Sequence, residues 1–414
     1  MIKKILVVLL VIVTGFSYAQ EGTSSPYSYY GIGLQKFKGT VENRSMGGLS
    51  FLTDSIHINL QNPSAYGDLR LTAYTIGASY NSLKLNSQTA SATADNATLD
   101  YLAVAIPAGK FGFGFGVVPI NAVGYQLASE QADGSQTKFS GTGGLNRVFL
   151  AAGVRINKNL NVGLDLHYNF GNIQNKALLT RPSVLYSTRE INDSNLSGFS
   201  MSLGVTFKTM LTEKLEITTS LVSSPSFALS SDNDRSLSSV IANGNGGETL
   251  IESRDIEVNN RDLDLPAEFK FGTGIGVPKN WYVGGEYVYV DAEKFENRSF
   301  NQEGVEYTNA SKFKMGGYYI PNYRSLTSYL NRIVYRAGVR YEETGLTIDN
   351  NAINEFGISF GVGLPVGRLF SNLNIGFEYG QRGTKDAGLI REDFMNLSLS
   401  LSLNDQWFRQ IKFN

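Results

Sequence analysis

Most of the chain alternates apolar and polar positions with a period of two. In the stretch 159–170 the apolar positions are Leu160, Val162, Leu164, Leu166, Tyr168 and Phe170. The same pattern recurs in 196–210, 353–366, 371–384 and 392–404. A half-buried β-strand has this period, whereas a helix repeats every 3.6 residues. The pattern therefore predicts an all-β protein.

Fourteen segments show enough alternation to be predicted as strands. They are 69–84, 96–107, 110–127, 137–156, 159–176, 196–210, 214–228, 263–277, 280–291, 311–320, 329–343, 353–366, 371–384 and 392–404. An even number of antiparallel strands is typical of closed barrels in the bacterial outer membrane. We therefore predict a 14-stranded antiparallel transmembrane β-barrel over residues 67–414.

The connections between these segments alternate between short and long. Tight turns are predicted at 107–110, 156–160, 211–215 and 277–281, and long polar loops at 83–96, 174–195, 230–262 and 292–309. Outer-membrane barrels have short periplasmic turns and longer extracellular loops. The alternative is two or three soluble β-domains, but the strand count, the loop asymmetry and an export signal favour the barrel.

The N-terminus has the features of a cleaved signal peptide over residues 1–19. Lys3 and Lys4 precede a short apolar run, and Ser17-Tyr18-Ala19 is a small-x-small cleavage site. The alternative is an N-terminal membrane anchor, but the apolar run is shorter than the ~20 residues that a spanning helix needs. The predicted location is the bacterial outer membrane.

Composition and charge exclude several classes of function. Lys+Arg total 36 against Asp+Glu 37, so no basic excess indicates nucleic acid. Cysteine is absent and histidine occurs twice, which argues against disulfides and transition-metal sites. Asp165 and His167 share a strand face, but no nucleophile stands at an identifiable spacing from them. We predict no catalytic residues, no metal, no cofactor and no enzymatic activity.

Residues 20–66 lack strand alternation and are too long for a linker. A barrel of fourteen strands encloses a lumen wide enough to leak. The segment is therefore predicted to fold inside the barrel as a hatch, or plug. The alternative is a disordered periplasmic tail.

Three stretches of this segment resemble the hatch of the FadL/TodX family. They read YGIG at 30–33, NRSMGG at 43–48, which includes Gly47 and Gly48, and NLQNPS at 59–64. Family members carry Asn-Pro-Ala before the first strand, where this chain has Asn62, Pro63 and Ser64. The resemblance extends over nearly the whole chain. It implies an outer-membrane channel for long-chain fatty acids and other hydrophobic compounds.

The third predicted strand contains a proline in its middle. Pro119 has no N–H and must break a ladder hydrogen bond, and nearby glycines such as Gly116 weaken the strand further. In the FadL family a kink in the third strand is a lateral exit toward lipid. The resemblance thus implies an exit at Gly116, Pro119 and Asn121. The alternative is a simple bulge that only curves the wall.

Charged residues on polar strand faces are predicted to point into the lumen. The segment 329–343 carries Arg332, Arg336 and Arg340, and other strands carry Glu286 and Glu378. The preferred interpretation is that paired charges brace the hatch. In the alternative interpretation, the arginines bind a substrate carboxylate with two parallel hydrogen bonds.

Two functions follow, each with its own partners. The first is passive uptake of hydrophobic small molecules resembling long-chain fatty acids, with outer-membrane lipid at the lateral exit. The second is an accessory or structural barrel subunit of an outer-membrane protein assembly or secretion complex, with another outer-membrane protein as its partner. An apolar lumen pocket joined to Pro119 would favour the first function, and a closed lumen without one would favour the second.

Overall fold

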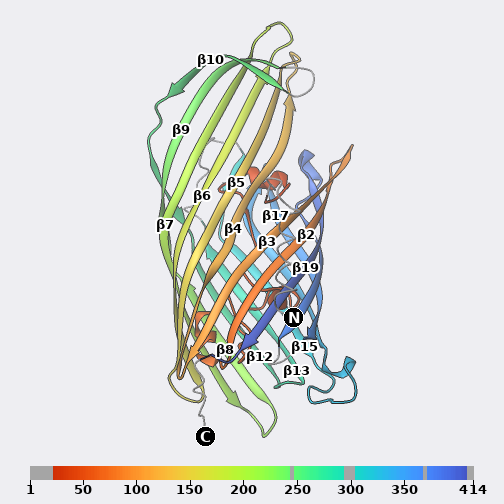
Figure 1. Ribbon diagram of the computed structural model, residues 1–414. Coiled ribbons are helices and arrows are strands. Elements are labelled where there is room, and N and C mark those ends of the chain that lie inside the picture. Colours follow the sequence, from red (N-terminus) through yellow and green to blue (C-terminus); the bar gives the residue numbers. More distant parts are fainter. Residues whose placement is uncertain (1–21, 243–246, 293–303, 367–370, 408–414) are drawn as a thin grey trace.

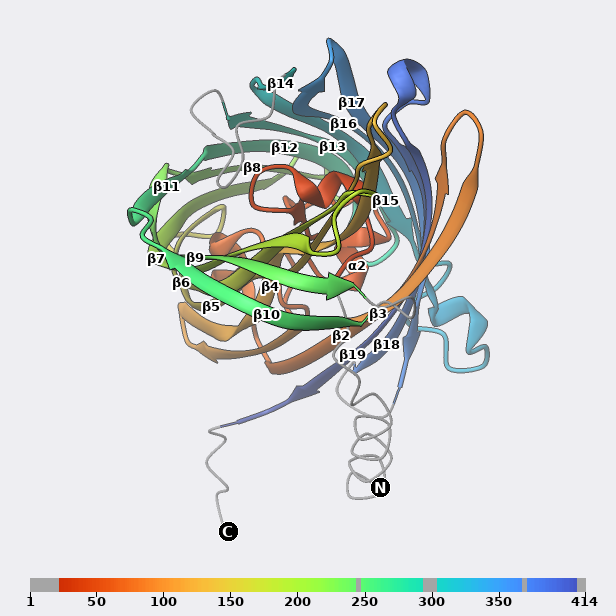
Figure 2. The same cartoon turned by 90° about the horizontal axis from the view of Figure 1, so that it is seen from above.

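A computed structural model describes residues 22–242, 247–292, 304–366 and 371–407. The chain forms a tall barrel whose wall surrounds the N-terminal segment (Figures 1 and 2). The predicted signal peptide, residues 1–19, lies outside the described residues.

The wall contains the fourteen predicted strands. Twelve of them are single elements, and the other two are interrupted and are built from several elements. The uninterrupted strands are β2 (Thr72–Asn86), β3 (Ser91–Ala108), β4 (Phe111–Glu130), β5 (Gln136–Arg155), β6 (Leu160–Thr180), β7 (Ser187–Met210), β13 (Trp281–Asp291), β15 (Ala310–Tyr319), β16 (Val334–Ile348), β17 (Asn351–Pro365), β18 (Asn372–Arg382) and β19 (Arg391–Asp405).

Two prolines interrupt the remaining two wall strands. The seventh consists of β8 (Glu216–Ser224) and β9 (Phe227–Ala242), separated at Pro225. The eighth consists of β10 (Glu248–Ile256), β11 (Arg261–Leu265) and β12 (Ala267–Val277), with Pro266 before β12. β19 pairs antiparallel with β2 and closes the wall. The predicted fold class is confirmed.

Several strands are longer than the alternation predicted. Most of the stretches 83–96, 174–195 and 230–262, predicted as loops, continue the wall as paired strands. β4, β5, β6, β7, β9 and β10 rise well above the rest of the barrel (Figure 1). Beyond the apolar band neither sheet face needs to be apolar, so the backbone pairing continues while the alternation fades.

The outer face of the barrel is apolar in a broad band. Exposed side chains there include Phe113, Leu150, Leu166, Phe313 and Leu399. Large exposed apolar side chains are stable on such a face only when lipid covers them. None of the helices in the described part of the chain has the length and hydrophobicity to span a bilayer.

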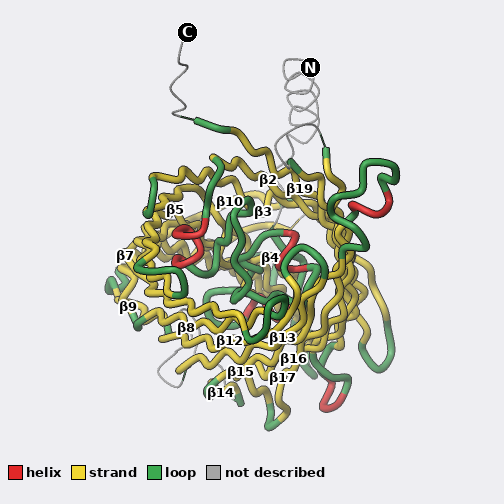
Figure 3. The backbone as a smooth tube through the Cα atoms, turned by 90° about the horizontal axis from the view of Figure 1, so that it is seen from below, coloured by secondary structure: helices red, strands yellow, loops and turns green. Residues whose placement is uncertain are grey.

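The N-terminal segment lies inside the ring of strands (Figures 2 and 3). It contains η1 (Pro26–Tyr29), β1 (Leu34–Gln35), α2 (Val41–Arg44) and η2 (Pro63–Asp68). Leu49 and Phe51 are fully buried. The prediction of an internal hatch is confirmed, and a disordered tail is excluded. The remaining elements, β14 (Val305–Tyr307), η3 (Leu330–Arg332) and η4 (Asp386–Gly388), lie in connections.

Candidate functional site

The end of the hatch docks on β6 and β7 through Asn62, Pro63 and Ser64. Asn62 Oδ1 accepts hydrogen bonds from Ser64 N and Oγ, and its Nδ2 donates to Thr206 Oγ1 at 3.1 Å. The Ser64 and Thr206 hydroxyl oxygens are 2.6 Å apart. Pro63 opens η2, a position that its fixed φ and missing N–H suit. Serine in place of the family's alanine thus adds a contact to the wall.

Glycine in the wall lets this motif approach the backbone. A Cβ on Gly163 would lie 2.2 Å from the Pro63 carbonyl carbon. A Cβ on Gly204 would lie 3.0 Å from Cδ of the same proline. The hatch therefore packs directly against the strand backbone, and a side chain at either glycine would clash with it.

Gly47 and Gly48 form a second close contact, against β15 and β16. Both have left-handed φ angles, +70° and +84°, which glycine adopts without a steric penalty. A Cβ on Gly47 would lie 2.7 Å from the Val339 carbonyl oxygen. The Gly47 N–H donates to Ser359 Oγ at 2.9 Å.

A buried ion pair holds the next part of the hatch. Glu286 Oε2 accepts hydrogen bonds from Ser50 N and Oγ at 2.6 and 2.7 Å. Lys314 Nζ donates to Glu286 Oε1 at 2.7 Å and to the Gly48 carbonyl oxygen at 3.1 Å. This wall pair completes the hydrogen bonds of the hatch backbone, so it braces the hatch.

The two inward-facing arginines of β16 already have partners. Arg340 contacts Glu355 at 2.5 Å and Glu378 at 2.8 Å. Arg336 Nη1 donates to Asn374 Oδ1 at 3.1 Å, and the Asn374 amide donates to Glu42 of the hatch at 2.8 Å. Such networks satisfy a guanidinium without a ligand. The arrangement favours bracing over capture of a carboxylate by these arginines.

The prediction that Arg332 belongs to the polar face of this strand is wrong. Arg332 lies in the 3₁₀ turn η3, and β16 begins only at Val334. Hydrogen bonds from Arg332 N to Tyr329 O and from Ile333 N to Leu330 O form the turn. The Arg332 guanidinium lies over the Tyr329 ring, 5.4 Å from its centroid. Period-two alternation places a side chain only where the backbone is extended.

The third strand, β4, separates from β3 halfway along its length. The described β3–β4 ladder runs from the pair Ala108–Phe111 to the pair Leu102–Val117. Gly116 lies in this paired part, and a Cβ there would be 2.3 Å from the Leu102 carbonyl oxygen. Beyond it the β4–β5 register shifts between Pro119 and Asn121.

The hatch covers the edge of β4 that β3 leaves. β1 pairs with β4 at Leu34–Ala122 and Gln35–Asn121. Asn121 Nδ2 donates to the Ile32 carbonyl oxygen at 2.5 Å, and Asn121 Oδ1 accepts from Leu145 N at 2.6 Å. Asn121 thus links the hatch to β5 across the bend.

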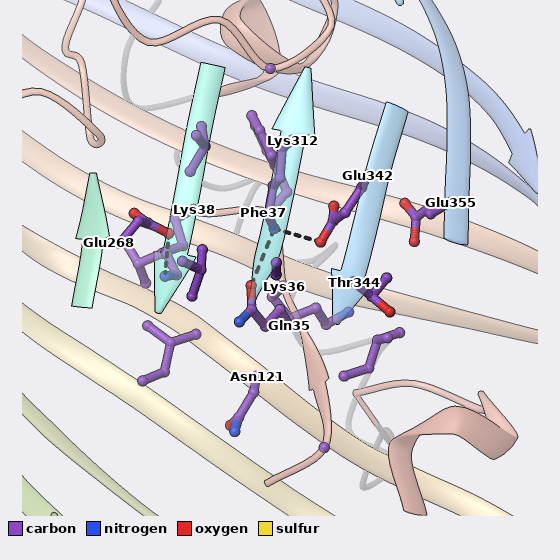
Figure 4. Close-up of a pocket in the computed structure, with 18 of the residues that line it drawn as sticks. Gln35, Lys36, Phe37, Lys38, Asn121, Glu268, Lys312, Glu342, Thr344 and Glu355 are labelled. Carbon is purple, nitrogen blue, oxygen red and sulfur yellow. Dashed lines mark hydrogen bonds and ion pairs between the residues drawn. The ribbon is translucent and has the colours of Figure 1, made fainter. Parts of the chain in front are cut away.

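A cavity of about 420 Å³ lies between the hatch strand and the wall (Figure 4). It reaches the bend of β4 at Val118, Ile120 and Asn121, and Phe37 supplies an aromatic surface. Its cationic lining is extensive. The nine cations that line it are Lys36, Lys38, Arg44, Arg147, Lys270, Lys312, Lys314, Arg340 and Arg382.

Most of this charge is neutralised. Lys38 and Lys270 share Glu268, at 3.9 and 2.7 Å, and Lys312 contacts Glu342 at 2.7 Å. Figure 4 shows Lys38 beside Glu268 and Lys312 beside Glu342. The cavity lining is therefore mixed, with paired charges beside apolar and aromatic side chains such as Ile120, Phe149 and Phe394.

The structure also brings Ser200 to the Asp165–His167 pair. His167 Nε2 is 3.0 Å from Asp165 Oδ2, and His167 Nδ1 is 3.2 Å from Ser200 Oγ. Sequence reasoning missed Ser200 because only the β6–β7 register pairs it with His167. The Asn169 amide also donates to Ser200 Oγ, at 2.8 Å, so the serine belongs to a wider polar network. Among the described residues no group of acidic or histidine side chains could hold a metal ion.

A fourteen-stranded wall around an internal hatch is a fold of the FadL/TodX type. The chain matches the toluene transporter TbuX of Ralstonia pickettii with a TM-score of 0.61 at 15% identity, covering 90% of this chain and 100% of that one. For the toluene transporter TodX of Pseudomonas putida the TM-score is 0.56 at 13% identity, covering 90% and 99%. These likenesses show the fold alone.

The family itself is defined by a separate match. The BamG family model covers residues 1–414, so the chain belongs to the BamG family. No curated protein matches the chain.

Proposed function

We propose that the protein is an accessory barrel subunit of the machinery that assembles outer-membrane β-barrels. The observation that carries the proposal is the match of the whole chain to the BamG family, whose name refers to the β-barrel assembly (BAM) complex. The partner is then another outer-membrane protein of that machinery.

The state of the lumen supports this function over hydrophobic uptake. The hatch is held by buried ion pairs such as Lys314–Glu286, and the cavity beside it is lined by many charged groups as well as apolar ones. A pocket for hydrocarbons is normally apolar with few polar groups. A hydrocarbon in this cavity would cover charged groups as well as apolar ones, which costs free energy for each charge that loses solvation.

The test is purification from the native host in a mild detergent, followed by native mass spectrometry. We expect a stoichiometric complex with a barrel subunit of the assembly machinery. An unrelated outer-membrane barrel carrying the same affinity tag is the control for chance association. A monomer that carries only a lipid-sized mass would contradict the proposal and support a channel.

The bend in β4 supports passive uptake as a second candidate function. The β3–β4 ladder stops at Val117, and the cavity extends to Val118 and Ile120 just beyond it. Under this hypothesis, Pro119→Ala would restore a ladder hydrogen bond and lower the uptake of a hydrophobic solute. Pro107→Ala, in the paired part of β3, is the matched control. Unchanged uptake in Pro119→Ala would exclude the bend as the exit.

A further inference from the structure

One connection is long at the end of the barrel where the other described turns are short. The short turns there are 109–110, 156–159, 211–215 and 278–280, whereas β15 and β16 are joined by residues 320–333. The end with short turns is the periplasmic one in barrels of this class. We call residues 320–333 the periplasmic loop. Hydrogen bonds fix its shape, from Asn322 N to Asn331 O at 2.8 Å and from the Tyr329 hydroxyl to Pro365 O at 3.0 Å.

The periplasmic loop holds apolar side chains away from the protein. Leu326 is 99% exposed, Leu330 is 65% exposed and Tyr329 is 43% exposed. By contrast Ile320 and Ile333, at the two ends of the loop, are buried. Because hydrogen bonds close the loop, the exposure of its tip is a feature of its fold. Several apolar side chains gathered on one short, ordered segment form a patch of the kind that marks an interaction surface.

Aromatic side chains of the wall place this loop at the membrane surface. Trp281, Tyr319 and Tyr335 stand opposite one another in the adjacent strands β13, β15 and β16. Girdles of aromatic residues mark the level of the lipid headgroups on the outer face of such barrels. The periplasmic loop begins directly after Tyr319, and Figures 1 and 2 show it projecting outward from the wall, away from the lumen.

The charges at this end of the barrel match an anionic surface. The periplasmic loop contains Arg324 and Arg332 and no acidic residue. Neither arginine forms an ion pair within the described part of the chain, and the Arg332 guanidinium lies over the Tyr329 ring. The short turns at the same end contain four lysines and one acidic residue, namely Lys110, Lys158, Lys214, Lys279 and Glu213. Basic residues near a membrane surface are attracted to anionic lipids.

We propose that the periplasmic loop is a lipid anchor. Leu326, Tyr329 and Leu330 insert into the periplasmic leaflet, while Arg324 and Arg332 bind the phosphates of anionic phospholipids. Segments that combine apolar side chains with cations bind anionic membranes through both. The headgroup level, the outward projection and the absence of acidic residues from the loop favour lipid over a protein partner as the occupant. This inference does not depend on the proposed role in barrel assembly.

The test measures how deep the loop lies in a bilayer. The chain has no cysteine, so Thr327→Cys, next to Leu326, accepts a single nitroxide label. The full mature chain is reconstituted in vesicles of phosphatidylethanolamine and phosphatidylglycerol, and collisions of the label with oxygen and with a water-soluble nickel chelate are measured. Gln131→Cys, in the β4–β5 turn at the opposite end, is the control that stays in water.

The label in the loop should collide with the chelate roughly fivefold less often than the control label, and more often with oxygen. Leu326→Ser should restore chelate collisions, because it removes the apolar tip. Chelate collisions equal to those of the control would overturn the proposal. A label protected from both reagents would indicate a protein as the occupant and would also overturn it.

Arginine variants test the anionic headgroup. Replacing phosphatidylglycerol with phosphatidylcholine should raise chelate collisions of the loop label roughly twofold. Arg324→Gln combined with Arg332→Gln should abolish this dependence on lipid charge, and Arg181→Gln, in the β6–β7 turn at the opposite end, should retain it. The heat-modifiable gel migration of a folded barrel verifies each variant. A loop label that lies equally deep in both lipids would overturn the role of charge.

Discussion

Two parts of the hatch meet the wall in different ways. At one end Asn62, Pro63 and Ser64 rest on glycine-lined backbone of β6 and β7, and the contacts to Thr206 complete their hydrogen bonds. Nearer the N-terminus, β1 pairs with two residues of β4, beside a cavity of about 420 Å³. The first contact is close-packed, whereas the second borders a cavity lined with charged groups.

This difference separates residues that hold the hatch from residues that do not. Close-packed contacts with satisfied polar groups are destabilised when an atom is added or removed. A side chain such as Lys36, which lines the cavity and forms no ion pair with another described residue, can be removed without leaving a partner unpaired. The stability of the hatch should therefore depend on some residues of this short segment and not on others.

The largest contrast is expected between Lys314→Met and Lys36→Met. Removing Lys314 leaves the Glu286 carboxylate buried without its counterion, at a cost of roughly 3–5 kcal/mol. Removing Lys36 breaks no ion pair, so stability should stay within roughly 0.5 kcal/mol. Urea unfolding and hydrogen exchange of residues 46–52 measure the loss of stability in each variant. Similar losses in the two variants would remove the proposed contrast.

Gly163→Ala should dislodge the docked end of the hatch. The added Cβ would collide with the backbone of Pro63, and overpacking of this kind costs roughly 1–3 kcal/mol. Gly285→Ala is the control, because its Cβ would meet only the Lys314 carbonyl oxygen, at 3.4 Å. Single-channel conductance and proteolysis of the hatch are the measurements. A closed, protease-resistant Gly163→Ala barrel would show that the contact is not needed.

Asn62→Ala should cost about 1–2 kcal/mol in local hatch stability. Its side chain caps η2 and bonds to Thr206, so both donors and acceptors lose partners. Ser64→Ala removes only one hydroxyl contact to the wall, so its cost should be smaller. Hydrogen exchange of residues 60–68 ranks the two variants. The reverse order would contradict the role assigned to Asn62.

The smallest effect is expected from the Asp54–His57 pair, whose side chains are 2.5 Å apart. Burial alone would lower the pKa of His57, but Asp54 raises it above 6.5, and His57 lowers the pKa of Asp54 to about 2. The histidine contribution is complete below pH 6.5 and is lost as pH rises through the folded pKa. The aspartate contribution is lost as pH falls from 3.8 toward 2.

Local stability of residues 54–57 should therefore be greatest between about pH 4 and 6.5. Half of the Asp54 side chain is exposed, which limits the effect to a few tenths of a kcal/mol, roughly. Hydrogen exchange, corrected for intrinsic rates, tests this in the wild type and in His57→Gln. The variant should show no loss above pH 6.5, and a matching decline in it would exclude the pair as the cause.

Alternation in the sequence was sufficient to predict the wall but not the details of the site. Leu160 to Phe170 alternate because one strand face meets lipid and the other meets the lumen, and this pattern is local. The hatch was recognisable as a segment that lacks the pattern. Arg332 was misplaced because nothing in the alternation marks the 3₁₀ turn before Val334. Ser200 was missed because its contact with His167 depends on register between strands.

By itself, the sequence determined that the chain is a β-barrel with an N-terminal hatch, because strand periodicity and its absence depend on neighbouring residues. Only the tertiary structure decided which charges are paired. Lys314 and Glu286 are 28 positions apart, and Lys36 differs from the other lysines solely in what the fold leaves around it. Pairing of charges is a property of distance in space, and the folded chain alone sets that distance.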